Sequence, residues 1–127
     1  MPRSTPTVDG DRIYCVSLNG DFVCADAKSG RIVWRHDYVA DFGGRIPTWG
    51  YCESPLIDGD RVVGTPGGSQ ASIVAFEKTT GKQIWSTGFG DGAGYASLIN
   101  VLVAGAPQYV QFMSGSVVGV HTDGGKL

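Results

Sequence analysis

Apolar and polar residues alternate along this chain in short runs bounded by turn residues. In the first third the runs are Thr5–Val8, Arg12–Ser17 (RIYCVS), Asp21–Asp26 (DFVCAD) and Arg31–Arg35 (RIVWR). They are rich in Val, Ile, Tyr, Phe and Trp, and an alternation with a period of two residues is typical of strands with one buried face. The pattern therefore predicts four consecutive β-strands.

Turn residues separate these runs, so each strand is expected to pair with the next. The turns are Asp9-Gly10-Asp11, Asn19-Gly20 and Lys28-Ser29-Gly30. Asn-Gly between apolar runs favours a two-residue hairpin turn, which would place Cys15 opposite Cys24. A strained cross-strand disulfide is conceivable at such a pair, but two small buried thiols packed together are the preferred interpretation.

The same order of strands and turns recurs twice. The second copy has strands over 54–57, 61–65, 72–76 and 82–86, with Asp58-Gly59-Asp60 as its first turn. The third copy has strands over 97–103, 108–113 and 116–121, with a turn predicted at Gly105-Ala106-Pro107, and it lacks the fourth strand. A four-stranded meander repeated every ~40–50 residues is the pattern of a β-propeller blade.

Glycine and tryptophan hold equivalent positions in the repeats: Gly30 with Trp34, Gly81 with Trp85, and Gly125 in the third copy. Each glycine is expected to take a positive φ in a tight turn, and each tryptophan to pack between neighbouring blades. The predicted boundaries are a blade over 4–38, an inter-blade loop over 39–52, a blade over 53–89 and an incomplete blade over 95–127, all within one domain over 1–127.

The stretches ADAKSGRIVW and AFEKTTGKQIW resemble the tryptophan-docking repeat of PQQ-like (pyrroloquinoline-quinone-like) β-propellers. That family includes quinoprotein dehydrogenases and outer-membrane assembly proteins of the BamB type. The resemblance implies an all-β fold, a propeller fragment of about two and a half to three four-stranded antiparallel blades. It also implies an extracytoplasmic, bacterial protein whose open blade edges are covered by further blades or by self-association.

Charge and motif content argue against several other classes of function. The net charge is −2, which does not suggest nucleic-acid binding, and no apolar run is long enough to span a membrane. The cysteines and histidines lack zinc-ligand spacing, and the GFGDGAG segment is interpreted as a flexible linker between blades. We therefore predict no catalytic residues and no metal site.

The long loop over 39–52 and the start of the next blade carry the candidate binding residues Arg45, Trp49, Tyr51 and Glu53. In a propeller this crossing lies on the same face as the turn over 65–70, and loops on a rigid scaffold commonly carry function. The alternative is that the aromatic residues only cover the propeller face and that Arg45 pairs with an acid such as Asp41.

Three functions remain open on the sequence alone. The leading hypothesis is a non-catalytic scaffold that binds a protein partner or a small polar ligand on its loop face, with no cofactor evident. The resemblance also allows a fragment of a PQQ-dependent dehydrogenase acting on an alcohol or sugar, in which PQQ and calcium would be bound. The third is a structural propeller joined to an enzyme domain.

Overall fold

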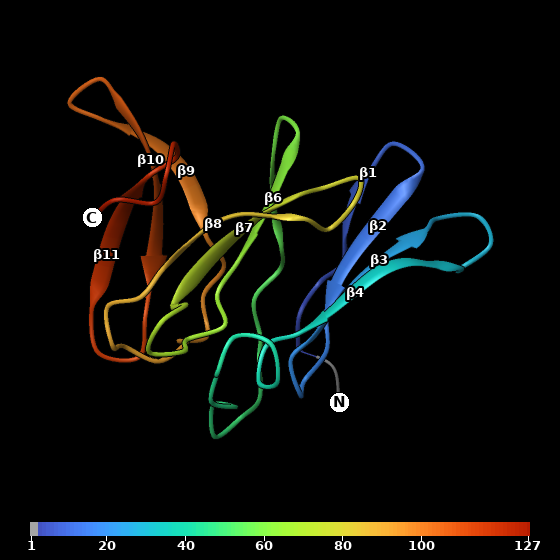
Figure 1. Ribbon diagram of the computed structural model, residues 1–127, viewed down its shortest axis with the longest axis horizontal. Helices are drawn as coiled ribbons and strands as arrows, with labels where there is room; N and C mark the ends of the chain where they lie inside the picture. The colour runs from blue at the N-terminus through green and yellow to red at the C-terminus, as the bar shows by residue number, and fades with distance from the viewer. Residues whose placement is uncertain (1–2) are drawn as a thin grey trace.

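The computed structural model describes residues 3–127, which form three antiparallel sheets standing side by side (Figure 1). The predicted domain also includes Met1 and Pro2, which lie outside the described residues. The first sheet contains β1 (Thr7–Asp9), β2 (Arg12–Val16), β3 (Asp21–Asp26) and β4 (Ile32–Asp37). The second contains β5 (Leu56–Asp58), β6 (Arg61–Gly64), β7 (Ile73–Glu77) and β8 (Gln83–Thr87). The third contains β9 (Ile99–Val103), β10 (Ala106–Phe112) and β11 (Val117–His121).

Each sheet is a meander in which consecutive strands pair, in the order β1-β2-β3-β4, β5-β6-β7-β8 and β9-β10-β11. The predicted all-β fold is confirmed. Among the described residues no helix is present, and hence none that could span a membrane.

The β2–β3 hairpin differs from the prediction by one residue. Its loop contains three residues, Leu18 to Gly20, closed by a hydrogen bond from Ser17 N to Asp21 O of 2.9 Å. Gly20 alone takes a positive φ, of 98°. Cys24 therefore pairs with Tyr14, and Cys15 with Val23, so the predicted Cys15–Cys24 pair is wrong. The shift places the two thiols on opposite faces of the sheet, and all three cysteines are free.

The first turn of the third sheet also lies elsewhere than predicted. It is formed by Ala104 and Gly105, with φ values of 49° and 81°, and β10 already begins at Ala106. Pro107 lies inside the strand opposite Leu102. Two consecutive residues with positive φ form the tight turn whose twist matches an antiparallel hairpin.

The core consists of two apolar layers, one in each space between neighbouring sheets. Trp34 of β4 occupies the first layer, where its ring centroid lies 5.3 Å from Phe22 and 6.0 Å from Phe76 of the second sheet. Trp85 of β8 occupies the second layer, stacked on Tyr109 of the third sheet with centroids 6.2 Å apart. The two tryptophans therefore hold neighbouring sheets together, and the sheets carry their connecting loops on a rigid base.

The turns that follow the third strand of each sheet, β3, β7 and β11, share one hydrogen-bond pattern. The N–H of Gly30 donates to Asp26 O, that of Gly81 to Glu77 O and that of Gly125 to His121 O, at 2.8–3.1 Å. The residue whose carbonyl accepts this bond differs among the three turns: it is Asp26, Glu77 or His121. Asp26 Oδ1 accepts bonds from Ser29 N and Ser29 Oγ, and the Ser29 amide is the main cause that lowers the pKa of Asp26.

Candidate functional site

The two crossings between sheets lie at the same end of the molecule as the β2–β3, β6–β7 and β10–β11 turns, and we call this end the loop face (Figure 1). Hydrogen bonds join these segments to one another. The N–H of Tyr51 in the first crossing donates to Leu18 O at 3.0 Å, and its hydroxyl donates to Pro66 O at 2.8 Å. In the second crossing, Gly92 O accepts from Ser114 N at 2.9 Å. Both long crossings are therefore fixed in place by the turns beside them.

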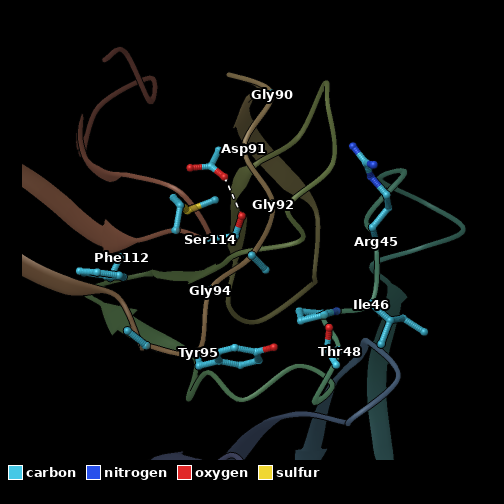
Figure 2. A pocket seen from close by; sticks show the side chains of 14 residues that line it. Arg45, Ile46, Thr48, Gly90, Asp91, Gly92, Gly94, Tyr95, Phe112 and Ser114 are labelled. Atoms are coloured by element: carbon cyan, nitrogen blue, oxygen red, sulfur yellow. Dashed lines mark hydrogen bonds between the residues drawn. The ribbon is translucent and has the colours of Figure 1, made fainter.

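A cleft of about 790 Å³ opens on the loop face between the two crossings. Its lining comes from residues 45–48 of the first crossing, 90–96 of the second, and 112–114 at the end of β10. Figure 2 shows Arg45, Ile46 and Thr48 on one side, with Asp91, Ser114 and Phe112 on the other and Tyr95 between them. Tyr95 and Ile46 are each 50% exposed, so the cleft presents apolar surface to solvent.

Asp91 fixes the far wall of the cleft. Its carboxylate accepts hydrogen bonds from Ser116 Oγ at 2.6 Å, from Ser114 Oγ at 2.9 Å and from the N–H of Gly115 at 3.2 Å. The bond from Ser116 is the largest cause that lowers the pKa of Asp91, and the bonds from Ser114 and Gly115 add to it. Asp91 therefore orders the β10–β11 turn beside the cleft as a charged acceptor.

A buried polar network lies beneath the cleft, centred on Glu53. Glu53 Oε1 accepts from Tyr38 Oη at 2.8 Å and from Thr65 N at 2.6 Å, while Oε2 has no hydrogen-bond partner within the described residues. Gln111 Nε2 donates to Thr65 Oγ1 at 2.8 Å, which extends the network to the third sheet. Burial raises the pKa of Glu53, and the bonds from Thr65 and Tyr38 only partly oppose this shift. Burial therefore stabilises the neutral acid relative to the carboxylate more than water does.

Gly64 makes room for this network. A Cβ at Gly64 would overlap the Tyr38 hydroxyl and lie 3.3 Å from Glu53 Oε1. Tyr38 is fully buried, and desolvation raises its pKa well above the usual value, with the adjacent Glu53 adding to the shift. The hydroxyl therefore stays protonated and donates to Glu53.

The four predicted binding residues separate into two groups. Arg45 is exposed at the cleft, and Trp49 is 60% exposed beside a second hollow of about 320 Å³, where the Arg3 guanidinium lies 5.4 Å from its ring. Tyr51 and Glu53 are 1% and 3% exposed and belong to the interior below the loop face. Ligand contact by Arg45 and Trp49 stays a prediction.

The alternative pairing of Arg45 with Asp41 is absent from the structure. Asp41 Oδ2 accepts from Asp37 N at 2.8 Å and lies 3.7 Å from Nδ1 of His36, and Arg45 forms no ion pair with any residue between 3 and 127. Asp41 closes the turn that follows β4, which leaves the Arg45 guanidinium available at the cleft.

Sequence reasoning missed the residues supplied by the second crossing. Asp91 and Tyr95 line the cleft, and the Tyr95 hydroxyl lies 3.4 Å from the Trp49 amide. The sequence predicts only a flexible linker over residues 88–94, which include Asp91 and end just before Tyr95. The sequence does contain one indication of these residues, namely their place after the fourth strand of a repeat. Residues 88–96 follow a fourth strand just as residues 38–53 do, so both crossings belong to the same face.

Comparison with known proteins places the fold among β-propellers of the PQQ-like type. A quinohemoprotein alcohol dehydrogenase (ADHIIG) from Pseudomonas putida HK5 superposes with a TM-score of 0.68 at 20% identity, covering 95% of this chain and 25% of that protein. BamB from Moraxella catarrhalis superposes with a TM-score of 0.60 at 20% identity, covering 98% and 33%. Both likenesses concern the fold.

The sequence model of the family described as "Outer membrane protein assembly factor BamB" matches residues 2–127, and the chain belongs to this family. A polyvinylalcohol dehydrogenase from a Pseudomonas species is 30% identical over an alignment of 114 positions, which covers 81% of this chain and 15% of that enzyme. The chain thus spans less than one sixth of the length of this curated relative.

Proposed function

We propose that this chain is part of a non-catalytic, extracytoplasmic β-propeller that binds a protein partner or a polar ligand at the cleft on its loop face. The observation that carries the proposal is the cleft of about 790 Å³, walled by both crossings and presenting Arg45, Ile46 and Tyr95. Clefts that combine apolar lining with a few polar groups are the usual binding sites of proteins. The family, whose description is that of an assembly factor, supports a binding role.

Site-specific photo-crosslinking tests this proposal. A photoreactive amino acid at Thr48, which lines the cleft, should crosslink a partner in the native host. The same residue at Lys82, exposed in the turn at the opposite end, is the matched control. A defined product from position 48 and none from position 82 is the expected result. Equal products from both positions, or none from position 48 with partner or added ligand present, would contradict binding at the cleft.

A second candidate function is electron transfer from an alcohol or sugar to PQQ, favoured by the similarity to the two alcohol-oxidising relatives. Calcium, which accompanies PQQ under this hypothesis, prefers six to eight oxygen ligands. The described residues contain no group of three or more His, Cys, Asp or Glu side chains that could hold a metal ion. Glu53 is buried, whereas the Trp49 side chain is exposed. The residues present therefore do not form such a site by themselves.

Addition of PQQ and calcium distinguishes the two candidates. Under the scaffold proposal, PQQ leaves the fluorescence of Trp49 unchanged and no alcohol-dependent dye reduction appears. Saturable quenching that is lost in Trp49→Phe, together with dye reduction, would favour the dehydrogenase.

A further inference from the structure

Two arginines on the loop face have no acidic partner. Arg12, Arg35 and Arg61 pair with aspartates within the chain. Arg3 and Arg45 form no ion pair within residues 3–127, although both lie beside hollows of the loop face. A guanidinium is always charged and presents several donors in a plane, which suits a carboxylate.

The acids near this face have their oxygens engaged by donors of the chain itself. Asp91 accepts hydrogen bonds from Ser114 Oγ, Gly115 N and Ser116 Oγ. Asp41 accepts one from the Asp37 amide. Asp37 Oδ1 accepts the amides of residues 39 and 40, and Glu53 is buried. The cationic side chains that line the two hollows are those of Arg45 and Arg3.

A ridge formed by Ile46, Pro47 and Thr48 separates the two hollows, since these residues line both of them. The ridge is held by a hydrogen bond from Gly50 N to Pro47 O of 2.8 Å. Arg45 and Tyr95 lie on its cleft side, whereas Arg3 and Trp49 lie on the other. A ligand that meets both arginines must cross the ridge and fill a hollow on each side.

Exposed aromatic surface lies close to both arginines. Trp49 is 60% exposed and Tyr95 50% exposed, and the Arg3 guanidinium stacks over the Trp49 ring. Trp, Tyr and Arg are the residues most enriched where protein partners bind tightly. The composition of this surface therefore favours a protein over a small ion.

We propose that the loop face binds an extended acidic segment of a partner protein, whose carboxylates meet Arg3 and Arg45 and whose apolar side chains enter the two hollows. This inference rests on the proposed binding function and names the class of partner. The chain as a whole has a net charge of −2, so its attraction for an acidic ligand would come from these two guanidinium groups. Each guanidinium can pair with one carboxylate. Nucleic acid, by contrast, is bound by many cations along a groove.

The test uses the full chain and fluorescein-labelled dodecapeptides containing alternating Asp and Phe residues. Matched peptides carry Asn or Lys in place of Asp, and binding is followed by fluorescence anisotropy. We expect the Asp peptide to bind ~10-fold more tightly than the Asn peptide. Arg45→Gln and Arg3→Gln should each weaken binding about 3- to 5-fold, as expected for one exposed ion pair. Arg31→Gln is the control, because Arg31 is exposed in a turn of the opposite end.

Equal affinity for the Asp and Asn peptides, or equal loss in Arg31→Gln and Arg45→Gln, would overturn the acidic partner. The absence of saturable binding by the Asp peptide up to about 1 mM would do the same. Displacement of the Asp peptide by single-stranded DNA at an equal concentration of negative charge would also overturn it, because any polyanion would then bind this face. A crosslinked partner at position 48 whose capture is unchanged in Arg3→Gln/Arg45→Gln would leave the binding function standing and refute this inference alone.

Discussion

The indole ring of Trp34 lies directly against Gly81 of the next sheet. A Cβ built on Gly81 would fall 2.7 Å from Cγ and Cδ2 of that ring, and the indole N–H donates to Lys78 O at 2.9 Å. The relationship repeats one sheet further on. A Cβ on Gly125 would overlap the Trp85 ring, and Trp85 Nε1 donates to Thr122 O at 3.2 Å. The repeated turn glycine of one sheet is therefore also the surface against which the tryptophan of the preceding sheet packs.

Gly81→Ala should destabilise the protein more than Gly30→Ala. Both glycines occupy the same position of the repeat with φ of 75° and 73°, so the backbone strain is matched. Only Gly81 meets a ring, because a Cβ on Gly30 has no neighbour within 4 Å. We expect Gly81→Ala to lower the free energy of unfolding by ~1–3 kcal/mol more than Gly30→Ala, measured by urea denaturation. Equal losses would show that the turn conformation alone requires glycine.

Replacing a buried tryptophan should cost more than replacing the exposed one. Trp34 and Trp85 are each 9% exposed, whereas Trp49 is 60% exposed. Trp34→Ala and Trp85→Ala are each expected to lower the free energy of unfolding by roughly 3–5 kcal/mol. Trp49→Ala should change it by about 0.5 kcal/mol or less. A loss below about 1 kcal/mol at Trp34 or Trp85 would refute their packing role.

Much of this packing could be predicted from the sequence, because the repeated turn residues and the Gly–Trp spacing mark strands and sheets directly. The register of the β2–β3 hairpin could not, because Asn19-Gly20 occurs in both two- and three-residue loops. The two loop types differ in backbone conformation, and in the structure Gly20 has a positive φ whereas Asn19 does not. The contact of Trp34 with Gly81 also joins separate repeats, and no local pattern of residues indicates which glycine receives which ring.

The site was harder to predict for the same reason. The position of Glu53 after a long polar loop predicts a surface residue, but Tyr38 and Thr65 donate hydrogen bonds to it. Gln111 of the third sheet donates in turn to Thr65. Burial of Glu53 is thus a property of the assembled sheets. Arg45 and Trp49 do lie on the loop face, since polar loops with isolated aromatic residues generally stay at the surface.

Glu53→Gln should change the pH dependence of stability. Burial raises the pKa of Glu53 above its usual value of 4.5, so its contribution to stability is full below that pH and is lost as the pH rises through the folded-state pKa. Stability of the wild type relative to Glu53→Gln should therefore fall as the pH rises from about 4.5. Thermal denaturation across this range measures the difference, and Glu77→Gln, at the end of β7, is the control. A wild type that gains stability relative to Glu53→Gln with rising pH would contradict a raised pKa.

Asp91→Asn should loosen the far wall of the cleft. The substitution removes the negative charge that accepts hydrogen bonds from three donors of the β10–β11 turn. The weaker hydrogen bonds should lower the free energy of unfolding by about 1–2 kcal/mol. Because the pKa of Asp91 is lowered, its contribution is present above the unfolded-state pKa and is lost as the pH falls through the folded-state pKa. Hydrogen exchange should speed up in residues 112–116. The double variant Ser114→Ala/Ser116→Ala keeps the carboxylate, and faster exchange there as well would assign the effect to the hydroxyl bonds; unchanged exchange in Asp91→Asn would refute the anchoring role.

The outer face of the third sheet should drive self-association of the isolated chain. Phe112 pairs with Val117 and Val110 with Ile99, so these side chains share one face, and Phe112, Val117 and Ile99 are 62%, 61% and 54% exposed. Apolar patches of this kind, next to an unpaired strand edge, recruit further chains. Light scattering should detect oligomers that Ile99→Lys/Val117→Lys reduces, whereas Ile84→Lys, an exposed position on β8, should leave them unchanged. A wild-type chain that is monomeric and melts cooperatively would show that this face needs no covering.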